Sequence, residues 1–241
     1  ACCEVFFCLK NILKEKNLST NVGDEGGFAP SLSSNEQAIE LILSAIRKSG
    51  YQEGKEIFLA FDIAASQFCF ENKFFLKKND KNYLSKEEMI HLYQNWWKKY
   101  PIISIEDPFV EDDFEGFSDL TKILKGVQIV GDDIFVSQKK RLIEGINKGS
   151  ANSILIKPNQ VGTISETLET IKIAKENNYK TIISHRSADT EDSFIADLAV
   201  GTSSMQIKTG SMSRSERISK YNRLLYIEKE LGKKAIYSQL V

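Results

Sequence analysis

The amino-acid sequence predicts an α/β fold built on a parallel sheet. Six short apolar runs alternate with six amphipathic stretches between residues 57 and 230, and strands that alternate with helices are typical of a parallel sheet. The runs are almost continuously apolar, as in Ile102-Ile103-Ser104-Ile105, which indicates strands that are buried on both faces. Each run also ends in an ionisable residue, and a barrel collects its functional groups at the carboxyl ends of its strands.

Two helices and a glycine-rich loop are expected before the first strand. Residues 4–17 place Val5, Leu9, Ile12 and Leu13 at helical spacing, with lysines on the other side. Three glycines within residues 23–27 cannot be accommodated comfortably inside a helix or strand, so they predict a shaped loop.

A second helix is expected over residues 36–48. Ser33, Ser34 or Asn35 could cap its start, and Gly50 marks its end.

The strands and helices of the repeating part follow in order. Strands are expected at 57–62, 102–106, 127–131, 153–157, 181–185 and 204–208, and helices near 86–98, 117–124, 138–148, 163–177, 191–200 and 214–230. Residues 67–84 interrupt this alternation, because aromatic residues around Asn72-Lys73 predict a hairpin insertion.

Composition excludes several functional classes. The 241 residues carry a net charge of −1, and the basic excess typical of nucleic-acid binding is absent. Four cysteines without a C-x-x-C pair indicate reduced thiols and a cytoplasmic location rather than a zinc site. No apolar run in the sequence approaches the length of a membrane span.

The ionisable residues at the six strand ends form the candidate site: Asp62, Glu106, Asp132, Lys157, His185 and Lys208. Three converging carboxylates would repel one another, and a divalent cation relieves that repulsion. Oxygen ligands favour Mg²⁺ or Mn²⁺ over zinc. The alternative is that each acid forms a structural ion pair with a lysine of the barrel.

Basic groups follow the acids along the chain. A lysine beside a metal cation and a second lysine can lose its proton and act as a base, so Lys157 is a candidate general base. The alternative is a strand-end lysine that extends to solvent. Arg186 and Ser187, next to His185, could hold a phosphate. His91 is expected to be an ordinary surface residue of a helix.

An ordered set of segments resembles the enolase family. They are NVGDEGGFAP (21–30), FDIAAS (61–66), SIEDPF (104–109), QIVGDD (128–133), SILIKPNQVGT (153–163), SHRSADTED (184–192), QIKTGSMSRSERISKYN (206–222) and IEKEL (227–231). The resemblance extends from about residue 4 to residue 231, and it implies a TIM-type (β/α) barrel of the enolase superfamily.

The resemblance implies a reaction and a role for each candidate residue. The reaction is the reversible, Mg²⁺-dependent dehydration of 2-phosphoglycerate to phosphoenolpyruvate in glycolysis. Asp62, Glu106 and Asp132 match metal ligands, Lys157 the base that takes the C2 proton, and Glu25 the acid that assists loss of the C3 hydroxyl; Lys208, His185, Arg186 and Ser187 match substrate contacts. A lysine base paired with Mg²⁺ is already the described arrangement of enolase-superfamily sites.

The resemblance also carries expectations about the extent of the chain. Family members begin with a small α+β domain and two further barrel strands, so we expect residues 1–241 to be one N-terminally truncated catalytic barrel domain with six strand–helix units. We expect this chain alone to be inactive, and the full-length protein to be a homodimer. Two other interpretations stay open: a non-catalytic binding or scaffold protein, and another dehydratase or racemase of the superfamily.

Four positions depart from the family's usual residues. Ala188 replaces a glycine, which costs stability only if the backbone there needs a positive φ, and Asp189 replaces a longer glutamate. Met205 stands where a small residue is common, and methionine packs adaptably. Tyr226 replaces an arginine and could weaken a contact at the dimer interface.

Overall fold

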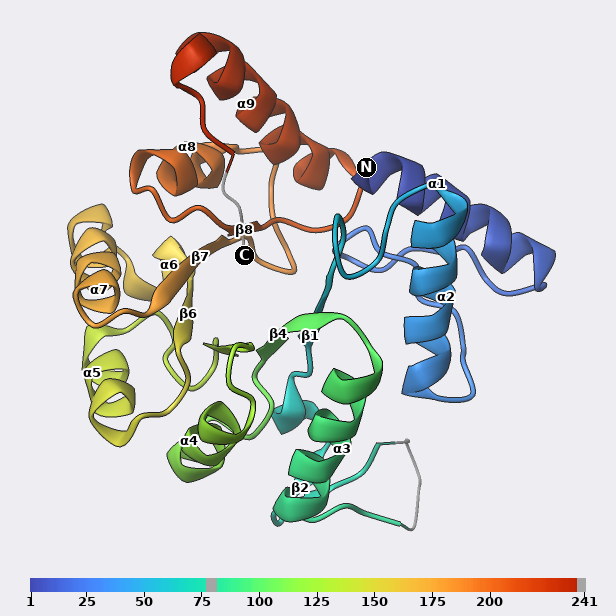
Figure 1. The fold of residues 1–241 in the computed structure, drawn as a ribbon. Coiled ribbons are helices and arrows are strands. Elements are labelled where there is room, and N and C mark those ends of the chain that lie inside the picture. The colour runs from blue at the N-terminus through green and yellow to red at the C-terminus, as the bar shows by residue number, and fades with distance from the viewer. Residues whose placement is uncertain (77–81, 238–241) are drawn as a thin grey trace. The chain divides into compact units, whose positions relative to one another are not determined.

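The computed structural model describes residues 1–76 and 82–237 (Figure 1). Its α-helices are α1 (Cys2–Glu15), α2 (Asn35–Lys48), α3 (Lys86–Lys99), α4 (Phe114–Ile123), α5 (Lys139–Lys148), α6 (Pro158–Val161), α7 (Ile164–Glu176), α8 (Phe194–Gly201) and α9 (Ser215–Leu231). Its strands are β1 (Leu59–Asp62), β2 (Cys69–Phe70), β3 (Lys73–Phe74), β4 (Ile102–Glu106), β5 (Gln128–Gly131), β6 (Ser153–Ile156), β7 (Lys180–Ser184) and β8 (Ile207–Lys208).

The main sheet confirms the predicted α/β alternation. Among the described residues it has six strands, and their order follows the chain, β1-β4-β5-β6-β7-β8. The pairs β1–β4, β4–β5, β5–β6 and β7–β8 are parallel. These six strands, each followed by helix, form an incomplete TIM-type barrel.

The chain divides into two compact units. One consists of residues 58–182, and the other combines residues 1–57 with residues 183–241. The expectation of one domain over residues 1–241 stays a prediction.

The unit of residues 58–182 contains β1, β4, β5, β6 and the first part of β7. Its helices α3, α4, α5 and α7 lie outside the strands (Figure 1). Val130, Leu155 and Ile182 form one buried apolar cluster. Burying such side chains is the main driving force for folding, at about 25 cal/mol per Å² of apolar surface.

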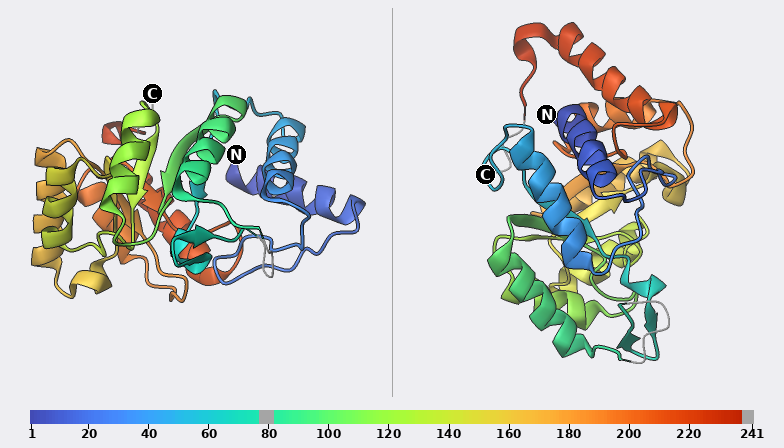
Figure 2. Two further views of the ribbon diagram at one scale, coloured as in Figure 1. Left: turned by 90° about the horizontal axis from the view of Figure 1, so that it is seen from below. Right: turned by 90° about the vertical axis from the view of Figure 1, so that its right-hand side faces the viewer.

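Among its described residues, the other unit contains the end of β7, paired with β8, and the α-helices α1, α2, α8 and α9. α1 and α2 lie side by side (Figure 2) and bury Ile12, Leu13, Leu41 and Ala45 between them. α8 and α9 are joined by Arg223, whose guanidinium donates to both carboxylate oxygens of Asp197.

Local sequence signals explain several element boundaries. Of the three candidate caps for α2, Ser34 is the one whose hydroxyl accepts from a backbone N–H, that of Gln37 at 3.2 Å. The predicted insertion contains the antiparallel β2–β3 hairpin, which turns at Glu71 and Asn72 with positive φ; residues 77–81 of the insertion lie outside the described residues.

Two details differ from the sequence prediction. The short helix α6 was not predicted, although Pro158 at its first position is a favourable helix start. The last strand begins at Ile207 rather than at residue 204, because Ser203 and Met205 have positive φ and cannot continue an extended ladder. Within the described ranges, no helix combines the length and apolar character needed to span a membrane.

Candidate active site

All six predicted strand-end residues lie where the sequence places them. Asp62, Glu106 and Lys208 are the last residues of β1, β4 and β8. Asp132, Lys157 and His185 each follow directly after β5, β6 and β7. Because the strands are parallel, the predicted strand-end residues of each unit lie together at the carboxyl ends of its strands.

The acidic residues belong to the unit of residues 58–182. Asp62 and Glu106 are register partners on the neighbouring strands β1 and β4. Glu106 is buried, with 5% of its surface exposed, whereas Asp62 is exposed. Two carboxylates side by side at a sheet edge repel each other unless a cation lies nearby.

Asp132 and Lys157 form a nearly buried ion pair. The Lys157 ammonium donates to Oδ2 of Asp132, and 14% and 11% of the two side chains are exposed. The second oxygen of Asp132, Oδ1, is buried and has no hydrogen-bond partner among the described residues. A buried carboxylate oxygen without a partner is costly, and a metal ligand is one role that satisfies it.

Asp107 is a functional candidate that the sequence analysis missed. Its two oxygens accept the backbone N–H groups of Asp132 (2.9 Å) and Asp133 (2.8 Å). Asp107 thereby fixes the turn after β5 and the position of Asp132. Burial raises the pKa of Asp107 to about 8, and burial together with the Asp132 charge raises the pKa of Asp133. The sequence segments themselves could have pointed to these two residues, because SIEDPF contains Asp107 and QIVGDD contains Asp133.

The carboxylates of this unit fit a divalent cation, although the closest group differs from the predicted trio. One ligand atom from each of Asp107, Asp132 and Asp133 lies within 4.8 Å of the other two. Asp62 and Glu106 are not members of that group. An all-oxygen donor set containing the unpartnered oxygen of Asp132 suits Mg²⁺.

Glu25 lies on the glycine-rich loop of the other unit. This loop is docked on the segment after β8, because its Glu25 carbonyl accepts from Ser211 N (2.9 Å) and its Gly26 carbonyl accepts from the Ser213 hydroxyl (2.7 Å). Gly26 has a φ of +80°, and a Cβ there would lie 2.6 Å from the Ser213 carbonyl oxygen. Only glycine fits this position without displacing the loop.

The carboxylate of Glu25 faces the predicted substrate residues. Its Oε1 accepts from the Ser187 hydroxyl at 2.9 Å, and its Oε2 lies 3.5 Å from Nε2 of His185. His185 and Ser187, together with the charge of Lys208, lower the pKa of Glu25 to about 2, against the opposing effect of partial burial. Glu25 is therefore a carboxylate at neutral pH.

An open cleft of about 380 Å³ lies beside Glu25 and is lined by Glu25, Gly27, Lys208, Thr209, Gly210 and Tyr221, with Ile207 and Ser211. It is large enough for a small anion, and the Lys208 ammonium supplies positive charge.

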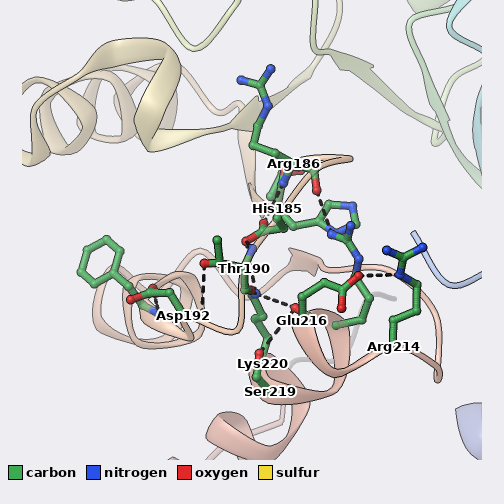
Figure 3. A network of polar contacts seen from close by, with 12 residues as sticks. His185, Arg186, Thr190, Asp192, Arg214, Glu216, Ser219 and Lys220 are labelled. Carbon is green, nitrogen blue, oxygen red and sulfur yellow. Dashed lines mark hydrogen bonds and ion pairs between the residues drawn. The ribbon is translucent and has the colours of Figure 1, made fainter. Parts of the chain in front are cut away.

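The side chain of Arg186 extends away from α9, as Figure 3 shows, while its backbone N–H donates to Asp189 at 2.9 Å.

Two of the family departures now have a structural reading. Ala188 is not among the residues with positive φ, so the expected cost of replacing glycine does not arise. Met205 has a φ of +62° and is 58% exposed, so it does not pack as the sequence analysis supposed. The prediction that His91 is a surface residue of a helix is confirmed, because it is exposed on α3.

Parallel strands that follow one another in chain order, each followed by helix, with functional groups at their carboxyl ends, are the arrangement of TIM-barrel proteins. The family model described as "Enolase, C-terminal TIM barrel domain" matches residues 1–240. The chain therefore belongs to the enolase family, as its C-terminal barrel domain.

Proposed function

We propose that this chain is the catalytic barrel of a lyase that reversibly dehydrates 2-phosphoglycerate to phosphoenolpyruvate and requires Mg²⁺. The observation that carries the proposal is the nearly buried Lys157–Asp132 pair at the carboxyl ends of neighbouring strands, in a chain that belongs to the enolase family. A cytoplasmic location and a homodimer at full natural length are proposed with it.

Lys157 is the proposed general base for the C2 proton. In the pair with Asp132 its side chain is an ammonium, which must lose a proton before it can accept the C2 proton. Its backbone N–H donates to the Ser137 hydroxyl at 2.8 Å, which fixes the start of its side chain. Pro158 supports this geometry, because the backbone of Lys157 is extended, with φ −116° and ψ 100°. A base must be held within hydrogen-bond reach of the proton it removes.

Asp62, Glu106 and Asp132 are the proposed Mg²⁺ ligands, and Asp107 holds the backbone that carries Asp132. When bound, Mg²⁺ would supply the positive charge that lowers the cost of removing a proton beside a carboxylate. Lys208, His185, Arg186 and Ser187 are the proposed contacts of the anionic substrate groups.

Glu25 is proposed to act at the C3 hydroxyl. Because its pKa is lowered to about 2, the free protein carries the ionised form. That form is suited to activate water in the hydration direction, so the dehydration direction requires Glu25 to gain a proton after substrate binds. Microscopic reversibility then assigns the same carboxyl group to both directions.

The test is the exchange of the C2 proton of 2-phosphoglycerate with deuterium, followed by NMR in the protein at its full natural length. We expect Lys157→Met to reduce exchange by about 10²- to 10⁴-fold, the usual contribution of a general base. The matched control is Lys148→Met, because Lys148 pairs with Glu144 on an exposed helix face, with 51% of its side chain exposed. Undiminished exchange in Lys157→Met would remove this residue from the base role.

A further inference from the structure

Arg217, in the first turns of α9, is a buried cation to which the sequence analysis gave no role. It is 1% exposed, and its guanidinium makes four close polar contacts. Nη1 lies 2.7 Å from Nδ1 of His185 and donates to the Arg186 carbonyl at 2.7 Å. Nη2 donates to the carbonyls of Asp24 at 3.0 Å and Ser187 at 2.6 Å.

These contacts connect two segments that carry proposed site residues. Asp24 precedes Glu25 on the glycine-rich loop, and Arg186 and Ser187 form the turn after β7. The three carbonyls and the imidazole are neutral acceptors, and no carboxylate in the described part of the chain pairs with Arg217. Burying a charge without a countercharge is expensive, so this arrangement is not explained by a simple gain in stability.

The contact with His185 determines the form of the imidazole. A guanidinium has five N–H donors and no acceptor, so Nδ1 of His185 must accept. The proton of the neutral ring then lies on Nε2. That nitrogen is buried, has no hydrogen-bond partner among the described residues, and lies 3.5 Å from Oε2 of Glu25.

We infer that Arg217 is a positioning residue that holds His185 in the Nε2–H tautomer and directs this N–H toward the side of Glu25. An oxygen of a bound substrate could accept from it there; this last step rests on the proposed function. The tautomer itself follows from the contact geometry alone.

The surrounding packing fits a side chain held in one place. Gly210 has a φ of +84°, and a Cβ at this position would lie 2.6 Å from Cδ of Arg217 and 2.7 Å from the Glu25 carbonyl oxygen. The absence of a side chain at residue 210 therefore lets the Arg217 stem pass close to the loop of Glu25.

Lys220, one turn further along α9, provides a matched comparison. It is also 1% exposed, and Figure 3 shows it in the same polar network as His185, Thr190 and Glu216. Its ammonium donates to Oδ1 of Asp189 at 3.3 Å and to the carbonyls of Thr190 and Glu216. Unlike Arg217, it makes no hydrogen bond to His185.

The direct test is ¹⁵N NMR of the two imidazoles of the wild-type chain, with His91→Gln used for assignment. Above the pH at which both rings are neutral, we expect His185 to show a pyridine-like shift at Nδ1 and a pyrrole-like shift at Nε2. The solvent-exposed His91 serves as the internal reference. A pyrrole-like Nδ1 in His185, or equal populations of both tautomers, would overturn the inference.

Two variants separate positioning from general support of the loop. Arg217→Lys keeps the charge but cannot make the four contacts, so the tautomer preference of His185 should be lost, while Lys220→Met should keep it. An unchanged tautomer in Arg217→Lys, or an equal loss in both variants, would contradict the positioning role.

If the proposed function holds, kcat/KM of Arg217→Lys should also fall by about 10- to 100-fold, the range found when groups that orient metal-bound histidines are removed. The NMR result does not depend on turnover, so a wrong reaction assignment and a wrong tautomer are distinguishable.

Discussion

Glu25 shows how a single side chain acquires its properties from contacts that are distant in the chain. Its nearest polar partners, His185 and Ser187, are 160 and 162 residues away in sequence (185 − 25 and 187 − 25). Those contacts stabilise the ionised carboxylate, so the protonation state of Glu25 reports on whether the glycine-rich loop is docked.

This linkage predicts a pH dependence of stability. Because the folded-state pKa of Glu25 is lowered from 4.5 to about 2, its contribution is present above pH 4.5 and is lost as pH falls toward 2. The side chain is 42% exposed, so solvent screening reduces the expected effect to about 1 kcal/mol.

We therefore expect Glu25→Gln to lower the free energy of unfolding by about 1 kcal/mol at pH 6 and to lower it by less at pH 3, as measured by urea denaturation. Glu191→Gln, at an exposed position, is the control and should change little at either pH. An equal loss at both pH values would show that the Glu25 charge is not linked to folding.

Among individual residues, the sequence allowed us to predict the side chains whose position depends only on the order and the ends of the strands. The six strand-end residues are of this kind, because a parallel sheet fixes where each strand ends. Asp107 and Arg217 could not be predicted from pattern, because their roles depend on backbone N–H groups and carbonyls that tertiary structure brings to them.

At the scale of elements, the β5–α5 unit depends on two glycines packed against one ring. A Cβ at Gly145, in the middle of α5, would lie 2.4 Å from Cε1 of Phe135, and a Cβ at Gly131, the last residue of β5, would lie 2.4 Å from Cδ2 of the same ring. Phe135 is fully buried. At residue 145, helix propensity therefore favours a residue with a side chain, whereas packing against Phe135 favours glycine.

We expect packing to prevail in Gly145→Ala. Alanine favours a helix over glycine by about 1 kcal/mol, but overpacking a full core costs about 1–3 kcal/mol, so the free energy of unfolding should fall by up to about 2 kcal/mol. The control is Gly201→Ala in α8, where an added Cβ would meet nothing within 4 Å, and stability should be unchanged or slightly higher.

Thermal or urea unfolding of both variants checks this prediction, and Phe135→Leu added to Gly145→Ala should recover part of the loss. If Gly145→Ala is as stable as the wild type, the close contact with Phe135 does not constrain α5.

The type of each element, helix or strand, was predictable where the spacing of apolar residues was clear. The first and last residues of the elements were not. The six strands and their following helices were predicted from alternation and apolar runs, whereas the short α6 and the late start of β8 depend on local backbone geometry. The positive φ of Met205 prevents strand β8 from beginning before Ile207, and no sequence rule predicts a methionine in that conformation.

At the scale of the whole molecule, the fold class and the kinds of chemistry were predictable, and the division of the chain was not. Contacts group residues 1–57 with residues 183–241, so Glu25 belongs with His185 and Lys208, while the carboxylates and Lys157 belong to residues 58–182. Sequence order alone separates Glu25 from His185, and only the folded chain brings the GDEGG loop against the turn after β7.

The proposed chemistry depends most on the acidic side chains of residues 58–182. The sequence predicts Asp62, Glu106 and Asp132 as metal ligands, whereas the close carboxylate group consists of Asp132 with Asp107 and Asp133. We propose that Asp107, whose two oxygens accept two backbone N–H groups, supports the site without binding the metal.

Anomalous diffraction from crystals of the protein grown with Mn²⁺, which accepts the same oxygen ligands as Mg²⁺, tests this claim most directly. We expect a peak within about 2.0–2.4 Å of carboxylate oxygens from Asp62, Glu106 and Asp132, with Asp107 still accepting its two backbone N–H groups. A peak held by Asp107 and Asp133 without Asp62 and Glu106, or no peak at any of these carboxylates, would contradict it.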